Sequence, residues 1–378
     1  MRHKIKSRHP VHKSFAPDTQ PVDRPHETRH SRINAWLKKH NKPVLGVVIM
    51  VVIILGGTIS YLFRNLKFAS TPVIVVAKKQ TPEVIHSQLT GAEVSVADSL
   101  RPVTAVMIEN SPDARPQSGL KDAGVVFESV AEGGITRFLV LYKETKASTI
   151  GPVRSVRPQF ASWVAAFDAG LAHVGGSDIP LGKLRSGQIK DLDQFFNAGA
   201  YTRVSFRAAP HNVYTTDDKL QALNKSKGYT SSSFTGWKRA KKEAPTSAPT
   251  AKTIAVPVST GLFAVNYSWD QASNTYLRSE GGAPHVDKEL GQIAPKVVIV
   301  MQVPHDVIKD SNNYSYPDVN TNGKAWVFQN GGVTEIIWSK AGDKEQIKFT
   351  DSAGKSVELN PGQTWITAIK PSVTPTWQ

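Results

Sequence analysis

The sequence has no cysteine among its 378 residues, and this absence excludes several kinds of site. Disulfide bonds, thiolate metal sites, a catalytic thiol and lipid attachment through an N-terminal cysteine all need that residue. The absence is compatible with an extracytoplasmic protein that folds without disulfides.

Several motifs of familiar catalytic and cofactor sites are also lacking. Beyond residue 43 there is no HExxH zinc motif, and the chain has no GxSxG nucleophile elbow and no GxxxxGK[ST] phosphate loop. The histidines of the outer part are isolated, and a lone histidine is more often structural than a ligand. We therefore expect no metal site and no cofactor, while the question of enzymatic activity stays open.

Positive charge is present but unevenly distributed. Residues 1–43 hold eleven Lys and Arg and only three acids, so they carry eight of the fifteen net positive charges of the chain. This polar stretch has no sustained apolar period and is predicted to be a disordered tail. Because the rest of the chain is only mildly basic, we expect no nucleic acid partner for it.

An uncharged apolar stretch, 44–63, follows the tail. Its length matches the roughly 20 residues that an α-helix needs to cross a bilayer. The excess of basic residues before it predicts a cytoplasmic N-terminus and an extracytoplasmic remainder, by the positive-inside rule. We therefore expect a single-pass membrane protein with the lipid bilayer as one partner.

Composition divides the remainder into a stalk, a mixed domain, a linker and a β-rich domain. The predicted bounds are 64–100, 101–228, 229–252 and 253–371, with a tail at 372–378. In the mixed domain, short apolar runs of strand length are interspersed with a segment of helical periodicity, which is typical of an α/β or α+β domain. In the β-rich domain, runs with a period of two lie between turn signals and indicate strands. The expected strands are 103–108, 125–127, 138–142, 171–174, 260–269, 275–279, 296–303, 325–329, 334–339, 347–350 and 364–369, and the expected helix is 159–167.

Charged side chains are concentrated in one segment of the mixed domain, 128–157, around the apolar run 138–142. Buried charge is costly unless it is paired or holds a ligand. If the chain is extended there, Glu128 and Glu132 face the same side. Two interpretations stay open. One is an anion-binding or acid–base cleft in which arginines clamp a carboxylate or phosphate; the other is a Glu–Arg network that braces loops.

Longer motifs of the chain resemble one bacterial family. They include RPVTAVMIENSPDARPQSGLKDAGVVFESVAEGGITRFLVL, IGPVRSVRP, AHVGGS, RAAPHNVYTT and GKAWVFQNGGVTEIIWSK. Over residues 101–371 the chain resembles the YerB-like lipoprotein family, which has N- and C-terminal domains of unknown function. The resemblance implies a surface-exposed envelope protein. Members are commonly attached through a lipidated cysteine, whereas this chain has none and carries the apolar stretch instead.

The family pattern implies a set of polar site residues. The candidate ligand-binding residues are Asn110, Arg115, Arg137, Arg154, Arg157, His173, Arg207 and Asn212, and the candidate catalytic residues are Glu128, Glu132 and His211. We expect a protein that binds an anionic cell-envelope component, such as a wall polymer, or that regulates an envelope enzyme. One alternative is a hydrolase or transferase acting on cell-wall glycan or peptide, with Glu132 and His211 as acid and base. Another is a non-catalytic interaction scaffold.

Overall fold

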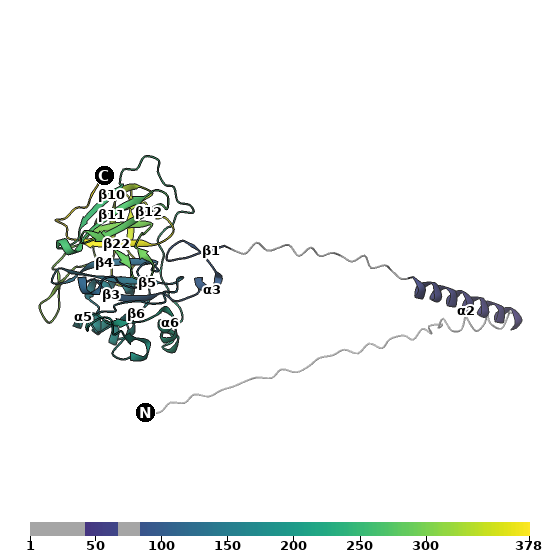
Figure 1. Cartoon of the computed structure of the whole chain (residues 1–378). Helices are drawn as coiled ribbons and strands as arrows, with labels where there is room; N and C mark the ends of the chain where they lie inside the picture. The colour runs from purple at the N-terminus through teal and green to yellow at the C-terminus, as the bar shows by residue number, and fades with distance from the viewer. Residues whose placement is uncertain (1–41, 67–83) are drawn as a thin grey trace, which may run out of the picture. The chain divides into compact units, whose positions relative to one another are not determined.

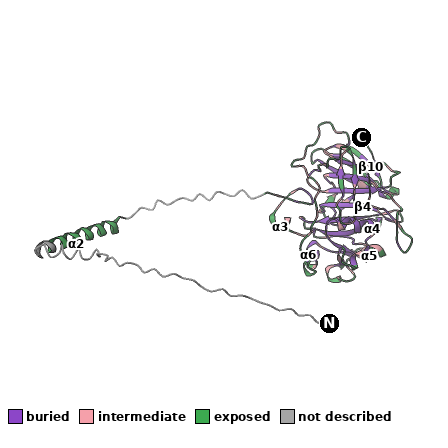
Figure 2. Cartoon of the chain, turned by 180° about the vertical axis from the view of Figure 1, so that it is seen from behind, coloured by how far each residue is buried: buried purple, intermediate pink, exposed green. Residues whose placement is uncertain are grey.

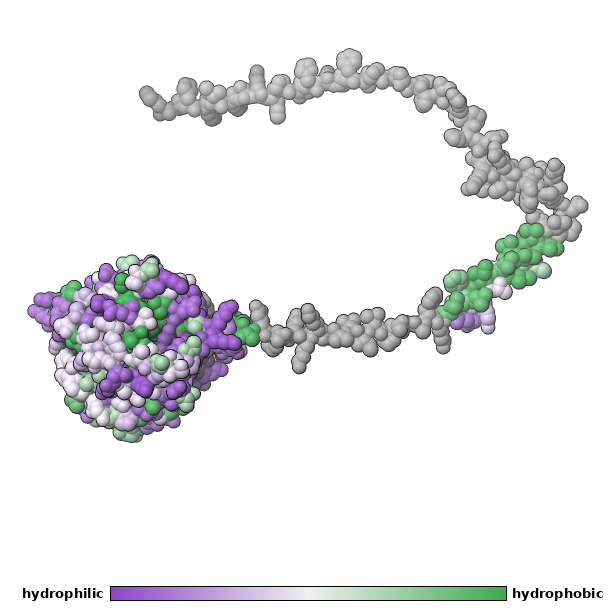
Figure 3. Space-filling model, turned by 90° about the horizontal axis from the view of Figure 1, so that it is seen from above, coloured by the Kyte–Doolittle hydropathy of each residue, from purple (hydrophilic) through white to green (hydrophobic). Residues whose placement is uncertain are grey.

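The computed structural model describes residues 42–66 and 84–378, in two compact units, Met1–Lys79 and Gln80–Gln378. In the first unit, α2 (Lys42–Asn65) is an apolar helix, coloured green for hydrophobic in Figure 3. Its large apolar side chains from Val47 to Phe63 are exposed. By length and composition alone it could cross a membrane. The predicted tail, except its last two residues, and stalk residues 67–83 lie outside the described residues.

The second unit is built on a ten-stranded mixed sheet (Figure 1). Its order is β21-β20-β19-β16-β22-β4-β5-β3-β6-β7, so strands from the two halves of the sequence meet where β22 pairs in parallel with β4. The strands are β3 (Thr104–Glu109), β4 (Val125–Glu132), β5 (Ile135–Tyr142), β6 (Gly170–His173), β7 (Lys190–Asp193), β16 (Val297–Gln302), β19 (Asn322–Gln329), β20 (Gly332–Ser339), β21 (Lys348–Thr350) and β22 (Thr364–Ile369).

Each face of this sheet is covered by a different layer. One face packs α4 (Pro158–Ala165) and α5 (Asp178–Arg185) into an apolar core that includes Phe127, Trp163 and Ile366. Pro158 opens α4 at a position where its missing N–H costs nothing. The opposite face packs α6 (Asp217–Ser226) and loops against the β3–β6 region. Figure 2 shows the buried strands of the sheet in purple.

A second sheet, with five antiparallel strands, covers the other half of that opposite face. Its order is β13-β12-β11-β10-β23, and its apolar side chains pack against Val298, Trp326 and Phe328 of the large sheet. The strands are β10 (Thr253–Pro257), β11 (Ala264–Asp270), β12 (Thr275–Glu280), β13 (Ala283–Pro284) and β23 (Thr376–Trp377).

Short elements complete the unit. The two-stranded pairs are β1 (Ile85–His86) with β2 (Glu93–Val94), β8 (Thr202–Arg203) with β9 (Val213–Tyr214), β14 (Val286–Asp287) with β15 (Gly291–Gln292), and β17 (Ile308–Lys309) with β18 (Ser315–Tyr316). The remaining helical turns are α3 (Val96–Ser99), η1 (Pro112–Ala114), η2 (Ala198–Ala200) and η3 (Gly261–Phe263).

The observed elements confirm the coarse prediction of a mixed helix and strand fold with a sheet-rich C-terminal region. The residues predicted as a linker, 229–252, contain no regular element, and Phe234 and Trp237 pack against the core beneath α4. Helices α5 and α6 were not predicted from the sequence.

Candidate functional site

The two glutamates of β4 point to opposite faces of the sheet, so the prediction that they face the same side was wrong. Strands β4 and β5 pair Glu128 with Phe138, but the register then shifts and pairs Glu132 with Ile135. An extra residue in one strand turns the following side chains to the other face. This bulge therefore places Glu132 on the face of Arg137.

Glu132 is held by two arginines. Nε and Nη2 of Arg157 donate to its two oxygens at 2.8 and 2.6 Å, and Nη2 of Arg137 donates at 3.2 Å. Burial alone would raise the pKa of Glu132, but the charges and hydrogen bonds of both arginines outweigh burial and lower the pKa. Burial, together with the like charge of Arg157, also lowers the pKa of Arg137 to about 10. An ionised carboxylate with both oxygens engaged is poorly suited to proton transfer.

Glu109, at the end of β3, organises the next predicted residues, Arg154 and His211. Its Oε2 atom accepts a hydrogen bond from Nδ1 of His211 at 2.9 Å and lies 3.3 Å from Nε of Arg154. Its Oε1 atom accepts from the hydroxyl of Ser111 at 3.1 Å. In the register of β3 and β5, Glu109 lies opposite Arg137, so this group adjoins the one around Glu132.

His211 also lines a groove of about 580 Å³, together with the predicted residues Arg115 and Arg207. We call this the basic groove and define it by Asp113, Arg115, Phe206, Arg207, His211 and Lys288. It has three cationic side chains, one acid and the exposed ring of Phe206. Such a lining favours an anionic ligand.

The cations of the basic groove differ in how firmly they are held. Arg207 donates from both η nitrogens to the backbone carbonyls of Asp113 and Pro116, so it also braces the wall of the groove. Lys288 lies with its Nζ atom 3.7 Å from the centre of the Phe206 ring. No carboxylate in the described part of the chain forms an ion pair with Lys288, which leaves its charge available to a ligand.

Glu128 belongs instead to a buried ion cluster on the opposite face of the sheet. Its side chain and that of Arg278 are both 0% exposed, and a carboxylate oxygen lies 3.1 Å from Nη2 of Arg278. Trp365 and Thr367 donate to the same carboxylate at 3.1 and 3.2 Å. Because Glu128 is closed off from solvent, the structure does not support the predicted catalytic role and assigns it a structural one. The buried ion cluster comprises Asn110, Arg115, Gln117, Glu128, Arg278, Glu280 and His285.

Asn110 and Arg115, predicted to bind ligand, turn towards Glu280 in this cluster. The Oε1 atom of Glu280 accepts hydrogen bonds from Nδ2 of Asn110 at 2.6 Å and from Nη2 of Arg115 at 2.9 Å. Nε of Arg278 donates to Nδ1 of His285 at 2.8 Å. Burial, with the charge of Arg278 adding to it, lowers the pKa of His285 well below its usual range, so this histidine is neutral. The cluster thereby joins strands from both halves of the sequence.

Burial raises the pKa of Glu280 to about 7 against the opposing charge of Arg278. The folded protein therefore keeps a proton that the unfolded chain releases above about pH 4.5, so the free energy of unfolding falls as the pH rises from about 4.5 to about 7. We expect Glu280→Gln, which cannot ionise, to lose less stability than the wild type between pH 5 and pH 8. Urea unfolding at several pH values measures this, and parallel profiles would contradict the assignment.

The other predicted residues lie outside both groups. His173 is fully buried, with Nδ1 2.7 Å from the carbonyl of Gly175 and Nε2 3.2 Å from Asp191. Asn212 accepts from Arg203 at 2.8 Å within the β8–β9 hairpin. Both contacts are structural, and neither side chain lines the basic groove.

The predicted site residues do not converge on one cavity. Arg207 and His211 line the basic groove, whereas Glu132 lines a separate cavity of about 480 Å³ with Ser259 and His305. Arg154 and Arg157 line neither cavity. The contacts of Glu132 with Arg137 and Arg157 are those that the bracing interpretation predicts, and only the basic groove still fits the binding interpretation.

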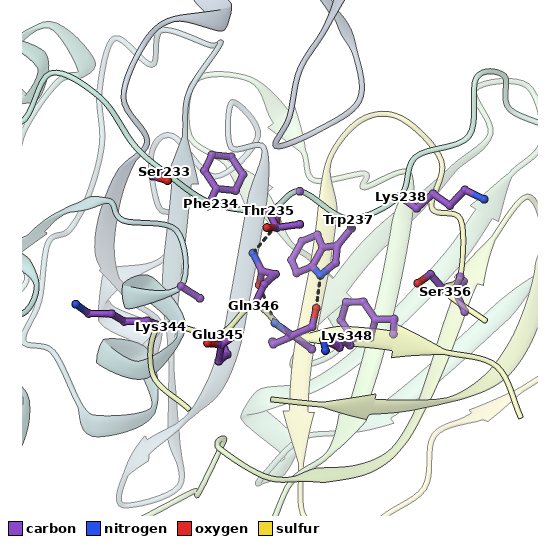
Figure 4. Close-up of a pocket in the computed structure, with 15 residues that line it drawn as sticks. Ser233, Phe234, Thr235, Trp237, Lys238, Lys344, Glu345, Gln346, Lys348 and Ser356 are labelled. Atoms are coloured by element: carbon purple, nitrogen blue, oxygen red, sulfur yellow. Dashed lines mark hydrogen bonds between the residues drawn. The ribbon is translucent and has the colours of Figure 1, made fainter. Parts of the chain in front are cut away.

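A third cavity, of about 490 Å³, contains no predicted site residue (Figure 4). It lies between residues 233–238 and 344–349, where the indole of Trp237 donates to the carbonyl of Ile347 at 2.8 Å. Lys344 and Lys348 also line it, and Figure 4 shows the side chain of Lys344 directed away from the indole. Among the described residues there is no group of three or more His, Asp or Glu suited to a metal ion.

Four residues of these sites were not predicted from the sequence: Glu109, Arg278, Glu280 and Lys288. Glu109 ends an apolar run, which is the same signal that singled out Glu128 and Arg137. In β12, Arg278 and Glu280 share a face with the buried Tyr276, so period-two alternation could have placed them inside. We find no sequence signal that distinguishes Lys288 from other surface lysines.

Comparison with known proteins identifies the family to which this chain is related. Residues 89–230 and 254–366 match the N-terminal and C-terminal domains of a protein family of unknown function, DUF3048. The YerB protein of Bacillus subtilis (strain 168) is 31% identical over 297 residues, which cover 78% of this chain and 88% of the relative. The chain belongs to the YerB-like family. The resemblance predicted from the sequence is thus confirmed.

The crystal structure of the YerB protein from Bacillus subtilis matches this fold with a TM-score of 0.69. At 30% identity, the match covers 77% of this chain and 99% of that structure. The sequence relative is described as a candidate lipoprotein. Together with the apolar helix α2, this description supports a membrane-anchored protein of the YerB-like family whose folded part is extracytoplasmic.

Proposed function

We propose that the folded unit binds an anionic polymer of the cell envelope through the basic groove. The observation that carries this proposal is the placement of Arg115, Arg207 and Lys288 around a groove that contains one acid, Asp113. Guanidinium and ammonium groups bind phosphate and carboxylate groups through charge-assisted hydrogen bonds. The exposed Phe206 ring offers an apolar contact for the uncharged part of such a polymer.

The proposed location supports this class of ligand. In our proposal α2 crosses the membrane once, with the basic N-terminal residues in the cytoplasm and the folded unit outside. Wall polymers are then within reach, whereas cytoplasmic nucleotides and nucleic acids are not. The same arrangement would allow the protein to act on an envelope enzyme that uses the polymer.

The acid–base pair predicted from the sequence has less support. Glu132 and His211 line different cavities, and both oxygens of Glu132 accept hydrogen bonds from Arg157. Glu128 is buried. A glycosidase using these carboxylates would need them across an open groove from each other.

Substitution of Lys288 tests the proposal without disturbing the fold. We expect Lys288→Ala to weaken binding of the full chain in detergent to poly(glycerol phosphate) by about tenfold to a hundredfold, because a charge-assisted hydrogen bond contributes about 1.5–3 kcal/mol. Surface plasmon resonance at low and high salt measures the change, and salt should weaken wild-type binding.

Lys348→Ala is the matched control, since it removes an equal charge from the lining of the cavity in Figure 4. It should bind the polymer as the wild type does. Equal affinities for the wild type and Lys288→Ala, or a larger loss with Lys348→Ala, would refute binding at the basic groove.

A further inference from the structure

Glu109 and His211 form a buried carboxylate–imidazole pair in the wall of the basic groove. The side chain of Glu109 is 5% exposed and that of His211 is 21% exposed, so the pair leads from the interior to the groove. The contact joins Oε2 of Glu109 to Nδ1 of His211 at 2.9 Å. Across the described ranges, the imidazole ring of His211 has hydrogen-bond partners at Nδ1 only, which leaves Nε2 for a ligand.

The carboxylate is held in place independently of the histidine. Ser111 donates to its Oε1 atom at 3.1 Å, and Nε of Arg154 lies 3.3 Å from its Oε2 atom. The carboxylate of Glu109 accepts from Nδ1–H of His211, which fixes the tautomer whose Nε2 carries a lone pair. A buried carboxylate in this position also stabilises the imidazolium that forms when Nε2 takes a proton.

We propose that His211 is a general base for hydrolysis of a phosphodiester bond bound in the basic groove, and that Glu109 is its positioning residue. The inference rests on the proposed binding of an anionic polymer and names the anionic group. A phosphodiester carries both the negative charge that the groove attracts and the bond to be broken. A bound carboxylate offers no such bond.

In the proposed step, a water molecule attacks phosphorus while Nε2 of His211 takes one of its protons. A bond forms between the water oxygen and phosphorus, and the bond between phosphorus and one ester oxygen breaks. The proton on Nε2 passes to the departing alkoxide, so the products are an alcohol and a phosphomonoester. Lys288, which has no ion-pair partner among the described residues, stabilises the charge that develops on the phosphoryl oxygens, with Arg207 beside it in the groove wall.

Turnover of bis(p-nitrophenyl) phosphate by the full chain in detergent, with a chelator added to silence metal-dependent contaminants, tests this step. We expect His211→Ala to lower kcat by about 10²–10⁴, the usual contribution of a general base, and free imidazole to restore part of it. Glu109→Gln should lower kcat by about tenfold or more with little change in KM. His305→Gln, in the separate cavity with Glu132, is the matched control and should match the wild type.

Binding of poly(glycerol phosphate), measured on the same samples, separates the two proposals. If the wild type binds the polymer but releases no p-nitrophenol, or if His211→Ala keeps full activity, the hydrolysis proposal is overturned and the binding proposal stands. If the wild type hydrolyses the substrate while Lys288→Ala binds poly(glycerol phosphate) as tightly as the wild type does, only the binding proposal fails. Release of phosphomonoester ends from poly(glycerol phosphate), but not from phosphatidylglycerol vesicles, would identify a wall polymer as the source; the reverse would identify a lipid headgroup.

Discussion

Arg278→Ala is expected to lower the free energy of unfolding by about 3–5 kcal/mol, the usual cost of leaving a buried charge unpaired. Glu128 would lose its cationic partner in a site where both side chains are 0% exposed. Trp365 and Thr367 would still donate hydrogen bonds to it, but no described cation would replace the arginine. Urea unfolding of the full chain in detergent, followed by tryptophan fluorescence, measures the loss.

Lys324→Ala is the matched control because it also removes one cation from an ion pair. Its partner Glu335 and Lys324 itself are more than half exposed, so the expected loss is about 0–1 kcal/mol. A double variant, Glu128→Gln with Arg278→Met, should recover part of the stability lost in Arg278→Ala, since it removes both charges of the Glu128–Arg278 pair. If Arg278→Ala costs no more than Lys324→Ala, the buried ion cluster does not hold the two halves together.

Trp163→Ala is expected to cost about 3–5 kcal/mol, as large-to-small changes of buried aromatic residues do. The indole of Trp163 stacks on Phe127 of β4 at a centroid distance of 4.9 Å and contacts Phe160 edge-on at 5.7 Å. Its removal would leave a cavity between α4 and the sheet. The same urea unfolding experiment measures the loss.

Trp163→Phe serves as the control for this second prediction. The buried Nε1 atom of Trp163 has no hydrogen-bond partner in the described structure, so the phenyl ring gives up no such bond. We expect a loss of less than half that of the alanine variant. Equal losses for both variants would show that the specific indole contacts, and not the filling of space, dominate.

The strands were largely predictable because buried strands leave a direct trace in the sequence. The run 138–142 is apolar throughout and forms part of β5, which lies inside the sheet. Turn signals such as Asn330-Gly331 separate β19 from β20 at the expected place. Strand order was not predictable, because the pairing of β22 with β4 joins residues more than 200 positions apart.

The site was predicted only in part, for reasons that particular residues make clear. Residue type identified Arg207 and His211, and the family resemblance added Arg115; all three line one groove. The bulge before Glu132 could not be foreseen, since nothing in the sequence marks an extra residue in β4, and it separates two carboxylates that an unbroken strand would align. The partners of Glu128 come from β12 and β22, which the sequence alone could not bring to β4.

The central claim is that the basic groove is where an anionic polymer binds. Hydrogen–deuterium exchange of the full chain in detergent, with and without poly(glycerol phosphate), tests it most directly. The account predicts slower exchange in residues 113–115 and 206–211, on the two walls of the groove, and unchanged exchange at 233–238 and 344–349. Protection confined to 233–238 and 344–349, with none at the basic groove, would contradict it.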